Sequence, residues 1–273
     1  MRIALVGPGR AGQSVAIAAN GAGHDVVAVV ARNDEQASIV ARRFDAVPLA
    51  IGDPVPPVDL IIIAVTDDSI GAVAGEIAPI ARNAAASAIH LSGATPVSAL
   101  QAFGDHGVAV GSFHPLQTMP TPDRGARRLP GAWVAVTAED PLKSSLHGFA
   151  RTIGLRPFDL RDDDRTAYHA AAAAAANFPV AALAIARHLF EAKGVAFDAA
   201  LPLVEAIVAN AFEFGPEASL TGPIARGDTA TVAAQIEAVR ETAPDLAAAF
   251  ESMVDATAVV ADSLTRKVEH EDG

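Results

Sequence analysis

The first twelve residues, MRIALVGPGRAG, most constrain what this chain can fold into. An apolar run of the β type at residues 3–6 leads into a Gly-x-Gly-x-x-Gly motif and then into a helical pattern. Gly7 permits a tight turn, Gly9 lets the backbone approach a pyrophosphate, and Gly12 lets the helix pack closely on the strand. The N-terminus of such a helix attracts phosphates. Because a second strand is predicted at residues 26–30, we interpret the motif as a dinucleotide-binding site and not only as a turn.

Composition limits the class of protein further. The 273 residues are 51% hydrophobic and 19% charged, which is typical of a globular chain long enough for two domains. The net charge of −12 argues against a nucleic-acid backbone or an anionic membrane as the main partner. The chain has no cysteine, which excludes disulfides, thiolate metal sites and cysteine nucleophiles.

Nothing in the sequence predicts secretion or a membrane anchor. The chain begins inside its first predicted strand, which leaves no room for a signal peptide. The longest apolar stretch, residues 170–186, is mostly alanine, contains Asn177 and Pro179, and is short for a bilayer span. We therefore interpret it as a buried helix and expect a soluble, cytoplasmic protein.

The first half of the chain alternates predicted strands and helices. Further strands are expected at residues 60–65, 88–91, 108–112, 133–137 and 156–160. This alternation predicts an α/β fold, a Rossmann doubly wound parallel sheet, with ligands in the crevice beyond the carboxyl ends of the strands. We assign residues 1–161 to a dinucleotide-binding Rossmann domain.

The second half carries only helical signals. Helices are expected at residues 162–193, 198–215, 228–240 and 244–267, with Asp228 as an N-cap and Pro216 and Pro244 as boundaries. Residues 162–273 are therefore expected to form an all-helical domain for substrate binding and dimerisation. We expect a homodimer joined by helices between Asp198 and Lys267, because this half is apolar and rich in alanine.

The end of the second strand indicates which dinucleotide binds. An NAD-binding chain has Asp or Glu about 20 residues after the glycine motif, whereas this chain has Arg32, with Asn33 beside it and Arg10 in the glycine turn. Guanidinium groups pair with a 2′-phosphate, so NADP(H) is the expected cofactor. The alternatives are that Arg32 is a surface charge and that Asp34 allows NAD. The expected cofactor-binding residues are Gly7, Pro8, Gly9, Arg10, Ala11, Gly12, Arg32, Asn33, Val65, Thr66 and Asp67.

Taken together, these features resemble the reductases related to 6-phosphogluconate dehydrogenase, which include ketopantoate reductase, pyrroline-5-carboxylate reductase, imine reductases and prephenate dehydrogenase. The segments HLSGA (90–94), GSFHPLQT (111–118) and LTGPIARGD (220–228) are similar to a bacterial Rossmann-like family whose helical domain is of unknown function. The resemblance covers nearly the whole chain. It implies a helical C-terminal domain like that of 6-phosphogluconate dehydrogenase and an oxidoreductase activity, and it leaves the substrate open.

The resemblance also implies catalytic residues. His114 precedes a proline after a strand, as in prephenate dehydrogenase, where such a histidine acts on the substrate hydroxyl with help from a serine that matches Ser92. The ordinary pKa of histidine suits the proton transfer that accompanies hydride transfer. However, Leu-Gln-Thr follows the His-Pro pair here, and the basic residue usual after that serine is missing. A structural histidine that holds its loop is the alternative.

The long helix of the second half carries Tyr168, His169 and Asn177. Positions eight apart lie about 80° from one another on a helix, so His169 and Asn177 can share a broad face. Ketopantoate reductase has a catalytic lysine and an asparagine at a similar spacing, and His169 replaces the lysine here. We expect either His114 or His169 to supply the proton, and Ser92 and Asn177 to orient the substrate. The alternative is that His169 and Asn177 satisfy buried backbone groups.

Arg226 and Thr221 lie in a turn-rich link and are candidate substrate-binding residues, with Arg226 suited to a carboxylate. A surface arginine is the alternative. No clustered histidine and carboxylate spacing predicts a metal site. The sequence thus predicts an NADP(H)-dependent oxidoreductase for a small carboxylate-bearing carbonyl or imine, with a ketopantoate-like 2-oxo acid favoured. An imine reductase, a prephenate-type dehydrogenase and a non-catalytic NADP(H) sensor are the alternatives.

Overall fold

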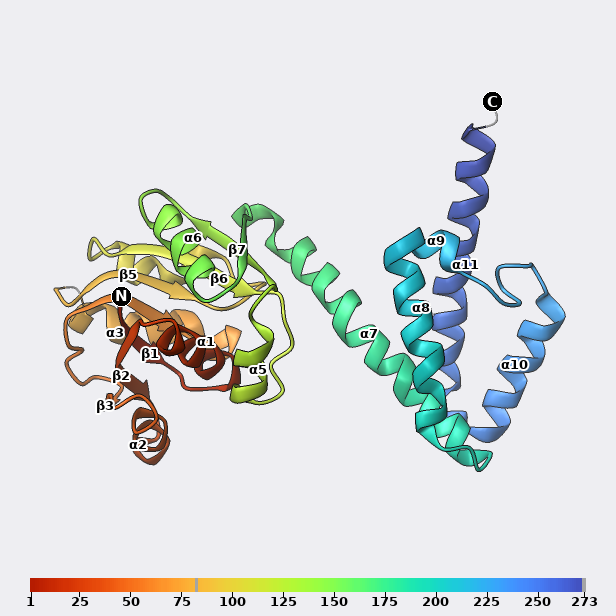
Figure 1. Cartoon of the computed structure of the whole chain (residues 1–273), viewed down its shortest axis with the longest axis horizontal. Coiled ribbons are helices and arrows are strands. Elements are labelled where there is room, and N and C mark those ends of the chain that lie inside the picture. The colour runs from red at the N-terminus through yellow and green to blue at the C-terminus, as the bar shows by residue number, and fades with distance from the viewer. Residues whose placement is uncertain (82, 272–273) are drawn as a thin grey trace. The chain divides into compact units, whose positions relative to one another are not determined.

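The computed structural model describes residues 1–81 and 83–271, with side chains up to residue 263. The chain forms two compact units, Met1–Ala173 and Ala174–Gly273. The first contains a sheet with helices on both faces, and the second consists of helices (Figure 1). The fold predicted from the sequence is confirmed, with the differences described below.

The first unit is built on one eight-stranded sheet in the order β3-β2-β1-β4-β5-β6-β7-β8. Its strands are β1 (Arg2–Val6), β2 (Asp25–Ala31), β3 (Val47–Ala50), β4 (Val58–Ile63), β5 (Ala85–His90), β6 (Ala109–Pro115), β7 (Trp133–Ala138) and β8 (Arg156–Asp159). All neighbouring pairs are parallel except β6 and β7. The order reverses between β1 and β4, where a doubly wound sheet opens its ligand crevice.

The antiparallel pair corrects the expectation of a wholly parallel sheet. Helix α5 (Pro122–Arg128) lies between β6 and β7, and it packs on α1 (Arg10–Gly21). At about 1.5 Å per residue α5 is only about 10 Å long, too short to carry the chain back along a seven-residue strand of about 23 Å. The chain therefore enters β7 from the edge at which β6 ends.

Buried apolar side chains cover both faces of the sheet. One core cluster joins the strands to α1, α2 (Asp34–Ala41) and α6 (Leu142–Thr152), and includes Val15, Leu146 and Phe149. The other joins them to α3 (Ile70–Ala81), η2 (Val97–Leu100) and α4 (Gln101–Gly104). The central strand β4 is buried on both faces at residues 60–63. The short helices η1 (Asp67–Ser69) and η3 (Asp162–Asp164) precede α3 and α7.

Helix α7 (Arg165–Ala192) begins in the first unit and continues into the second. The sequence places a domain boundary at residue 161, whereas the compact units divide after Ala173. The first turn of α7 belongs with the sheet because Arg165, at its start, is buried against strand residues.

The second unit contains the rest of α7, η4 (Phe197–Ala200), α8 (Leu201–Phe214), α9 (Pro216–Ser219), α10 (Thr229–Thr242), η5 (Pro244–Leu246) and α11 (Ala247–Glu271). Asp228 caps α10 as predicted, since its side chain accepts a hydrogen bond from the Thr231 amide at 3.0 Å. The stretch Asp162–Ala192 is long and apolar enough to cross a membrane by length and composition alone, with a mean hydropathy of 1.5. Only 6% of its apolar window is buried, so the expectation of a buried helix at residues 170–186 is wrong. One such helix is by itself weak evidence for a membrane span.

Candidate functional site

The turn between β1 and α1 has the geometry predicted for a glycine motif. Gly7 has a φ of +77°, and a Cβ there would collide with Val65. A Cβ on Gly12 would lie 2.6 Å from Ala64 Cβ, so this glycine lets α1 approach the sheet. At Gly9 the nearest atom would be 3.7 Å away, an ordinary contact. Gly7 and Gly12 are therefore required by the packing of the chain itself, whereas Gly9 is not.

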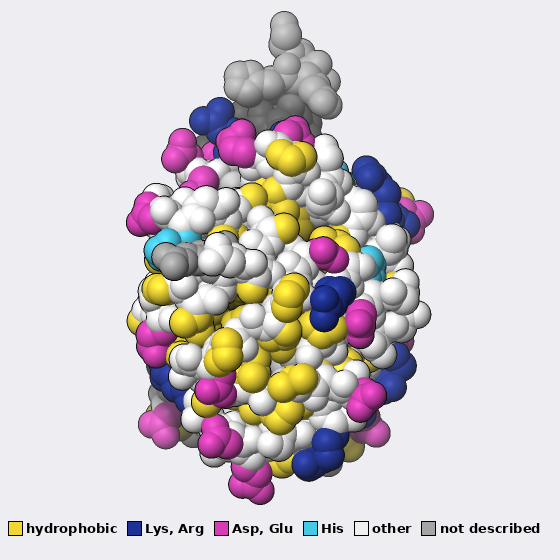
Figure 2. Space-filling model, turned by 90° about the vertical axis from the view of Figure 1, so that its left-hand side faces the viewer, with side chains coloured by type: hydrophobic (Ala, Val, Ile, Leu, Met, Phe, Trp, Pro, Cys, Tyr) yellow, Lys and Arg dark blue, Asp and Glu magenta, His cyan; other side chains and the backbone are white. Residues whose placement is uncertain are grey.

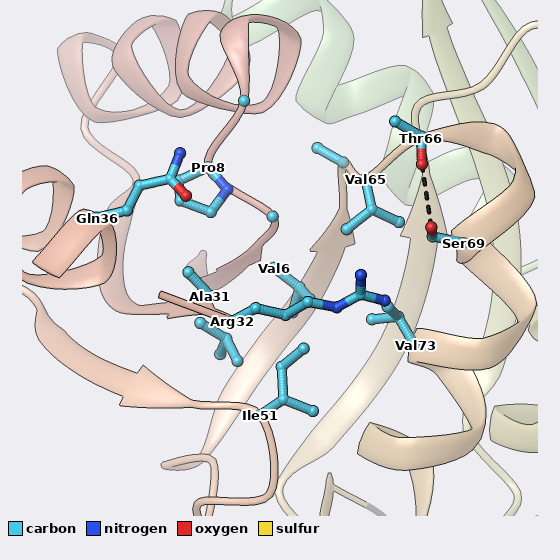
Figure 3. Close-up of a pocket in the computed structure, with 14 residues that line it drawn as sticks. Val6, Pro8, Ala31, Arg32, Gln36, Ile51, Val65, Thr66, Ser69 and Val73 are labelled. Carbon is cyan, nitrogen blue, oxygen red and sulfur yellow. Dashed lines mark hydrogen bonds between the residues drawn. The ribbon is translucent and has the colours of Figure 1, made fainter. Parts of the chain in front are cut away.

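A pocket of about 300 Å³ opens beside this turn at the carboxyl ends of β1, β2 and β4. Arg32 follows β2, and its side chain extends across the pocket toward Val73 (Figure 3). Of the residues predicted to bind a cofactor, those that line the pocket are Gly7, Pro8, Gly9, Arg32, Val65 and Thr66. The pocket thus joins the glycine turn and a cationic side chain in one cavity.

Five other predicted residues do not line this pocket: Arg10, Ala11, Gly12, Asn33 and Asp67. Asn33 has a different task, because its side chain caps α2 by accepting a hydrogen bond from the Gln36 amide at 2.8 Å. Residues that the sequence did not single out also line the pocket: Gln36, Ile51, Ser69 and Val73. Their positions depend on how β3, α2 and α3 pack, which no local motif reports.

A second group of polar side chains lies at the end of β6. His114 Nδ1 is 2.9 Å from the Tyr168 hydroxyl, and the His114 and His169 ring centroids are 6.0 Å apart. Gly93 makes this pairing possible, because a Cβ there would lie 2.7 Å from His169 Nδ1 and 2.9 Å from His114 Nε2. The structure therefore brings His114 and His169 together, with Tyr168 as the hydrogen-bond partner of His114.

Burial sets the protonation of this group. It lowers the pKa of His114 to about 4, with further lowering by His169 and Arg165, and it raises the pKa of Tyr168 to about 12. At neutral pH Tyr168 keeps its proton, and which of the two groups donates in their hydrogen bond depends on the tautomer of His114. His114 is then neutral, which corrects the expectation of a histidine with an ordinary pKa.

Ser92 lies in the loop that follows β5. Its hydroxyl oxygen accepts hydrogen bonds from the amides of Ala94 and Thr95 at 3.2 and 3.0 Å, which leaves its own proton free to donate. His90 Nδ1 accepts from the Ser92 amide at 3.2 Å. Burial above all, with Arg165 next, lowers the pKa of His90 to about 3, so His90 supports the loop as a neutral ring.

The remaining predicted residues lie in the second unit. Asn177 is exposed on α7, and Thr221 and Arg226 are exposed in the link before α10. Their roles stay predictions. Among the residues that the structure describes, no group of three or more histidine and carboxylate side chains could hold a metal ion.

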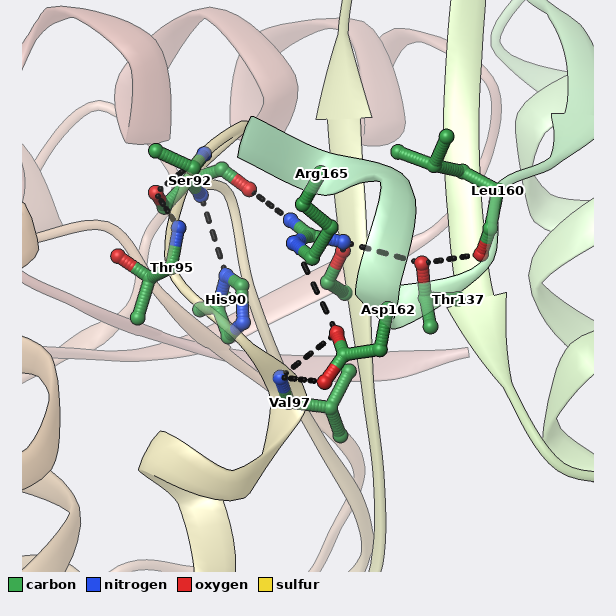
Figure 4. Close-up of polar contacts among 10 residues, drawn as sticks. His90, Ser92, Thr95, Val97, Thr137, Leu160, Asp162 and Arg165 are labelled. Atoms are coloured by element: carbon green, nitrogen blue, oxygen red, sulfur yellow. Dashed lines mark hydrogen bonds and ion pairs between the residues drawn. The ribbon is translucent and has the colours of Figure 1, made fainter. Parts of the chain in front are cut away.

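The sequence reasoning missed Arg165. This side chain is buried and donates hydrogen bonds to three oxygen atoms, which belong to Ser92, Ser112 and Thr137 (Figure 4). The available signal was an arginine directly after three aspartates at the start of an apolar helix.

Figure 2 shows one face of the molecule, on which acidic and basic side chains lie around a central group of apolar ones without a continuous basic area.

Solved structures share this architecture. A proposed NADP oxidoreductase from Bacteroides fragilis is 22% identical, with a TM-score of 0.80, and the match covers 94% of this chain and 97% of that one. A reductive aminase from Aspergillus terreus in complex with NADPH and ethyl levulinate is 16% identical, with a TM-score of 0.68 and coverage of 96% and 99%. A pyrroline-5-carboxylate reductase from Coxiella burnetii is 14% identical, with a TM-score of 0.57 and coverage of 96% and 97%. These likenesses show the fold.

Family models match both parts of the chain, whereas no curated protein matches it. Residues 1–115 match the Rossmann-like domain, and residues 132–257 match a family described as a domain of unknown function, DUF2520. The second match begins at the last two strands of the sheet and so includes more than the helices. The first part of the chain is therefore similar to Rossmann-like domains and the second part to DUF2520 domains.

Proposed function

We propose that this chain is an NADP(H)-dependent oxidoreductase that acts on a small carbonyl or imine compound. The observation that carries the proposal is the register of the sheet, in which Val6 pairs with Ile63, Ile63 with His90, and His90 with Ser112. This register aligns the carboxyl ends of β1, β4, β5 and β6. The pocket and the His114–Tyr168 pair therefore lie at the same edge of one sheet, where doubly wound folds bind ligands.

The residues at the pocket fit NADP(H). Gly9 has room for a close neighbour that the chain itself does not supply, as a pyrophosphate at the N-terminus of α1 would require. The Arg32 guanidinium in the same pocket suits a 2′-phosphate, and the described lining contains no carboxylate that would repel one. NADP(H), when bound, supplies or accepts a hydride. The reductive aminase named above, whose structure is in complex with NADPH, supports this assignment.

The proton chemistry belongs to the end of β6. In the tautomer with its hydrogen on Nε2, neutral His114 donates a hydrogen bond to a carbonyl oxygen or imine nitrogen, while Tyr168 donates to Nδ1. In the oxidative direction the other tautomer acts, in which Nδ1–H donates to the Tyr168 hydroxyl and Nε2 accepts the proton of a substrate hydroxyl. The free Ser92 proton supplies a second donor, and His169 is the competing acid. Asn177, Thr221 and Arg226 are proposed to orient the substrate, with Arg226 on a carboxylate.

Two substrate classes follow from different observations. Arg226 favours a 2-oxo acid of the ketopantoate kind, because a guanidinium binds a carboxylate through two hydrogen bonds. The fold shared with a reductive aminase and a pyrroline-5-carboxylate reductase favours an imine. We propose a cytoplasmic homodimer in either case.

NADPH oxidation across a panel of 2-oxo acids and cyclic imines tests the proposal. With a substrate that is turned over, His114→Ala should lower turnover by about 10²–10⁴, the usual worth of acid–base catalysis, with NADPH affinity intact. His106→Ala, at an exposed turn, is the control. A larger loss in His169→Ala would assign the acid to His169. If the protein binds NADPH but reduces no compound, the proposed oxidoreductase activity is contradicted and a non-catalytic NADP(H) sensor is favoured.

A further inference from the structure

Arg165 is buried even though it carries a charge. It is the first residue of α7, and its side chain is 1% exposed. A buried guanidinium is costly unless hydrogen bonds and an opposite charge compensate it. The surroundings of Arg165 supply both, and they come from segments far apart in the sequence.

The guanidinium donates to oxygen atoms at three neighbouring strands. Nη1 donates to the Ser112 hydroxyl in β6 at 2.6 Å and to the Thr137 hydroxyl in β7 at 3.0 Å. Nη2 donates to the carbonyl of Ser92, which follows β5. The planar fork of arginine matches such divergent acceptors, which a lysine ammonium cannot reproduce. Arg165 therefore holds the beginning of the 92–97 loop, the segment from Ser92 to the first residue of η2, against β6 and β7.

Asp162 holds the other end of the same loop. Its carboxylate accepts hydrogen bonds from the Val97 amide at 3.0 and 3.2 Å, and Oδ1 lies 3.8 Å from Arg165 Nε (Figure 4). An ion pair from η3 and the first turn of α7 thus attaches both ends of the 92–97 loop. Gly93 lies between these ends, directly against the His114 and His169 rings.

We propose that Arg165, together with Asp162, is a positioning residue of the candidate site, which fixes the 92–97 loop to the start of α7. The loop sets the room available to both histidines, and the same helix carries Tyr168 and His169. The charge of Arg165 also helps to keep the pKa of His114 low, alongside burial and His169. The role in turnover rests on the proposed function, whereas the role in positioning does not.

Three variants separate charge from geometry. Arg165→Met removes both, Arg165→Lys keeps the charge without the fork, and Arg161→Met changes a neighbouring arginine whose side chain is 79% exposed. The readouts are the NMR titration of the His114 ring, which faces Tyr168, His169 and Arg165, the NADPH dissociation constant, and the kcat and KM of any substrate.

We expect the His114 pKa to rise in Arg165→Met and to stay low in Arg165→Lys. In both variants kcat should fall by about 10²-fold, the effect of misplaced catalytic groups, with NADPH affinity unchanged. Arg161→Met should match the unmodified protein. In a fourth variant, Arg165→Ala, added guanidinium ions should restore part of the kcat.

Full kcat in Arg165→Lys, or an unchanged His114 titration and kcat in a folded Arg165→Met, would overturn the proposal. If Arg165→Met does not fold, the kcat of Arg165→Lys decides. A loss of about 10²-fold supports the proposal, and full kcat overturns it. If the unmodified protein reduces nothing, the proposed function fails. The positioning role is then judged by whether the His114–Tyr168 contact, seen as an NMR cross-relaxation signal, is lost in Arg165→Lys.

Discussion

Arg32 is the residue whose charge bears most directly on cofactor choice. It lines the pocket, whereas Arg10 does not, although both were expected to contact the cofactor. We predict that NADPH binds at least tenfold more tightly than NADH, which corresponds to about 1.4 kcal/mol. Arg32→Asp should erase or reverse this preference, and Arg10→Asp should change it much less. Calorimetric titration measures both affinities, and equal affinities in the unmodified protein would contradict the prediction.

Two buried histidines predict how stability depends on pH. The pKa values of His90 and His114 are lowered to about 3 and about 4, below the ordinary value of about 6.5. Between about pH 6.5 and pH 4 the unfolded chain therefore binds more protons than the folded one. The free energy of unfolding should be greatest above pH 6.5 and fall as the pH drops, by up to about 1.4 kcal/mol per pH unit for each histidine.

Urea unfolding at pH 7 and pH 5 measures this slope. His90→Asn removes one titrating ring and should flatten the dependence, while His106→Asn, at an exposed turn, should leave it unchanged. If His90→Asn keeps the full slope, His90 does not stay neutral in the folded protein.

Residues with a local signal were predictable, and residues defined by long-range contacts were not. The glycine motif, Arg32 and His114 each follow a strand in a recognisable pattern, and the structure places them at one sheet edge. Arg165 could not be predicted, because its acceptors belong to positions 92, 112 and 137. The low pKa of His114 likewise arises from burial, which the sequence around it does not report.

At the scale of elements, the β1–α1 turn offers a test that separates folding from binding. Gly9→Ala should leave the melting temperature nearly unchanged, because its Cβ would meet only the Ala64 carbonyl at 3.7 Å. It should weaken NADPH binding at least tenfold, since the methyl group occupies space that the pyrophosphate needs. Gly12→Ala is the matched control: its Cβ would lie 2.6 Å from Ala64 Cβ, so it should lower the melting temperature.

Thermal denaturation measures the melting temperatures of the two variants, and calorimetric titration measures their affinities for NADPH. A Gly9→Ala protein that binds NADPH as tightly as the unmodified chain would show that no cofactor approaches this glycine.

Elements with strong periodicity were predicted, and the exceptions have physical causes. The strand β3 was missed because it is a short edge strand that contains Pro48, which weakens the β signal. The direction of β7 depends on the length of α5 and on its packing against α1, not on the composition of β7. The four-residue α9 is too short for any helical period to appear.

At the scale of the whole molecule, the helical unit has little core of its own. Among its described side chains the buried apolar ones are Ile185, Ala200, Val239 and Ala243. Large apolar side chains of this unit are instead exposed: Phe178, Val180, Val195, Leu201, Leu203, Ile207, Val208, Phe212, Phe214 and Val259. Exposed apolar surface of this kind marks an interface. We take the partner at this interface to be a second copy of the chain, because further copies are present wherever the chain is made.

We therefore predict a homodimer joined through helices between Asp198 and Lys267, with well over about 1,200 Å² buried. Phe212 is 90% exposed and Leu203 is 68% exposed, so the double variant Leu203→Glu/Phe212→Glu places two charges on this surface and should yield monomers. Ile39→Glu is the control, because Ile39 is equally apolar and 53% exposed but belongs to the first unit. Light scattering at micromolar concentration measures the mass of each protein. A monomer mass for the unmodified chain would contradict the dimer, and a dimer that persists in the double variant would move its interface away from α8.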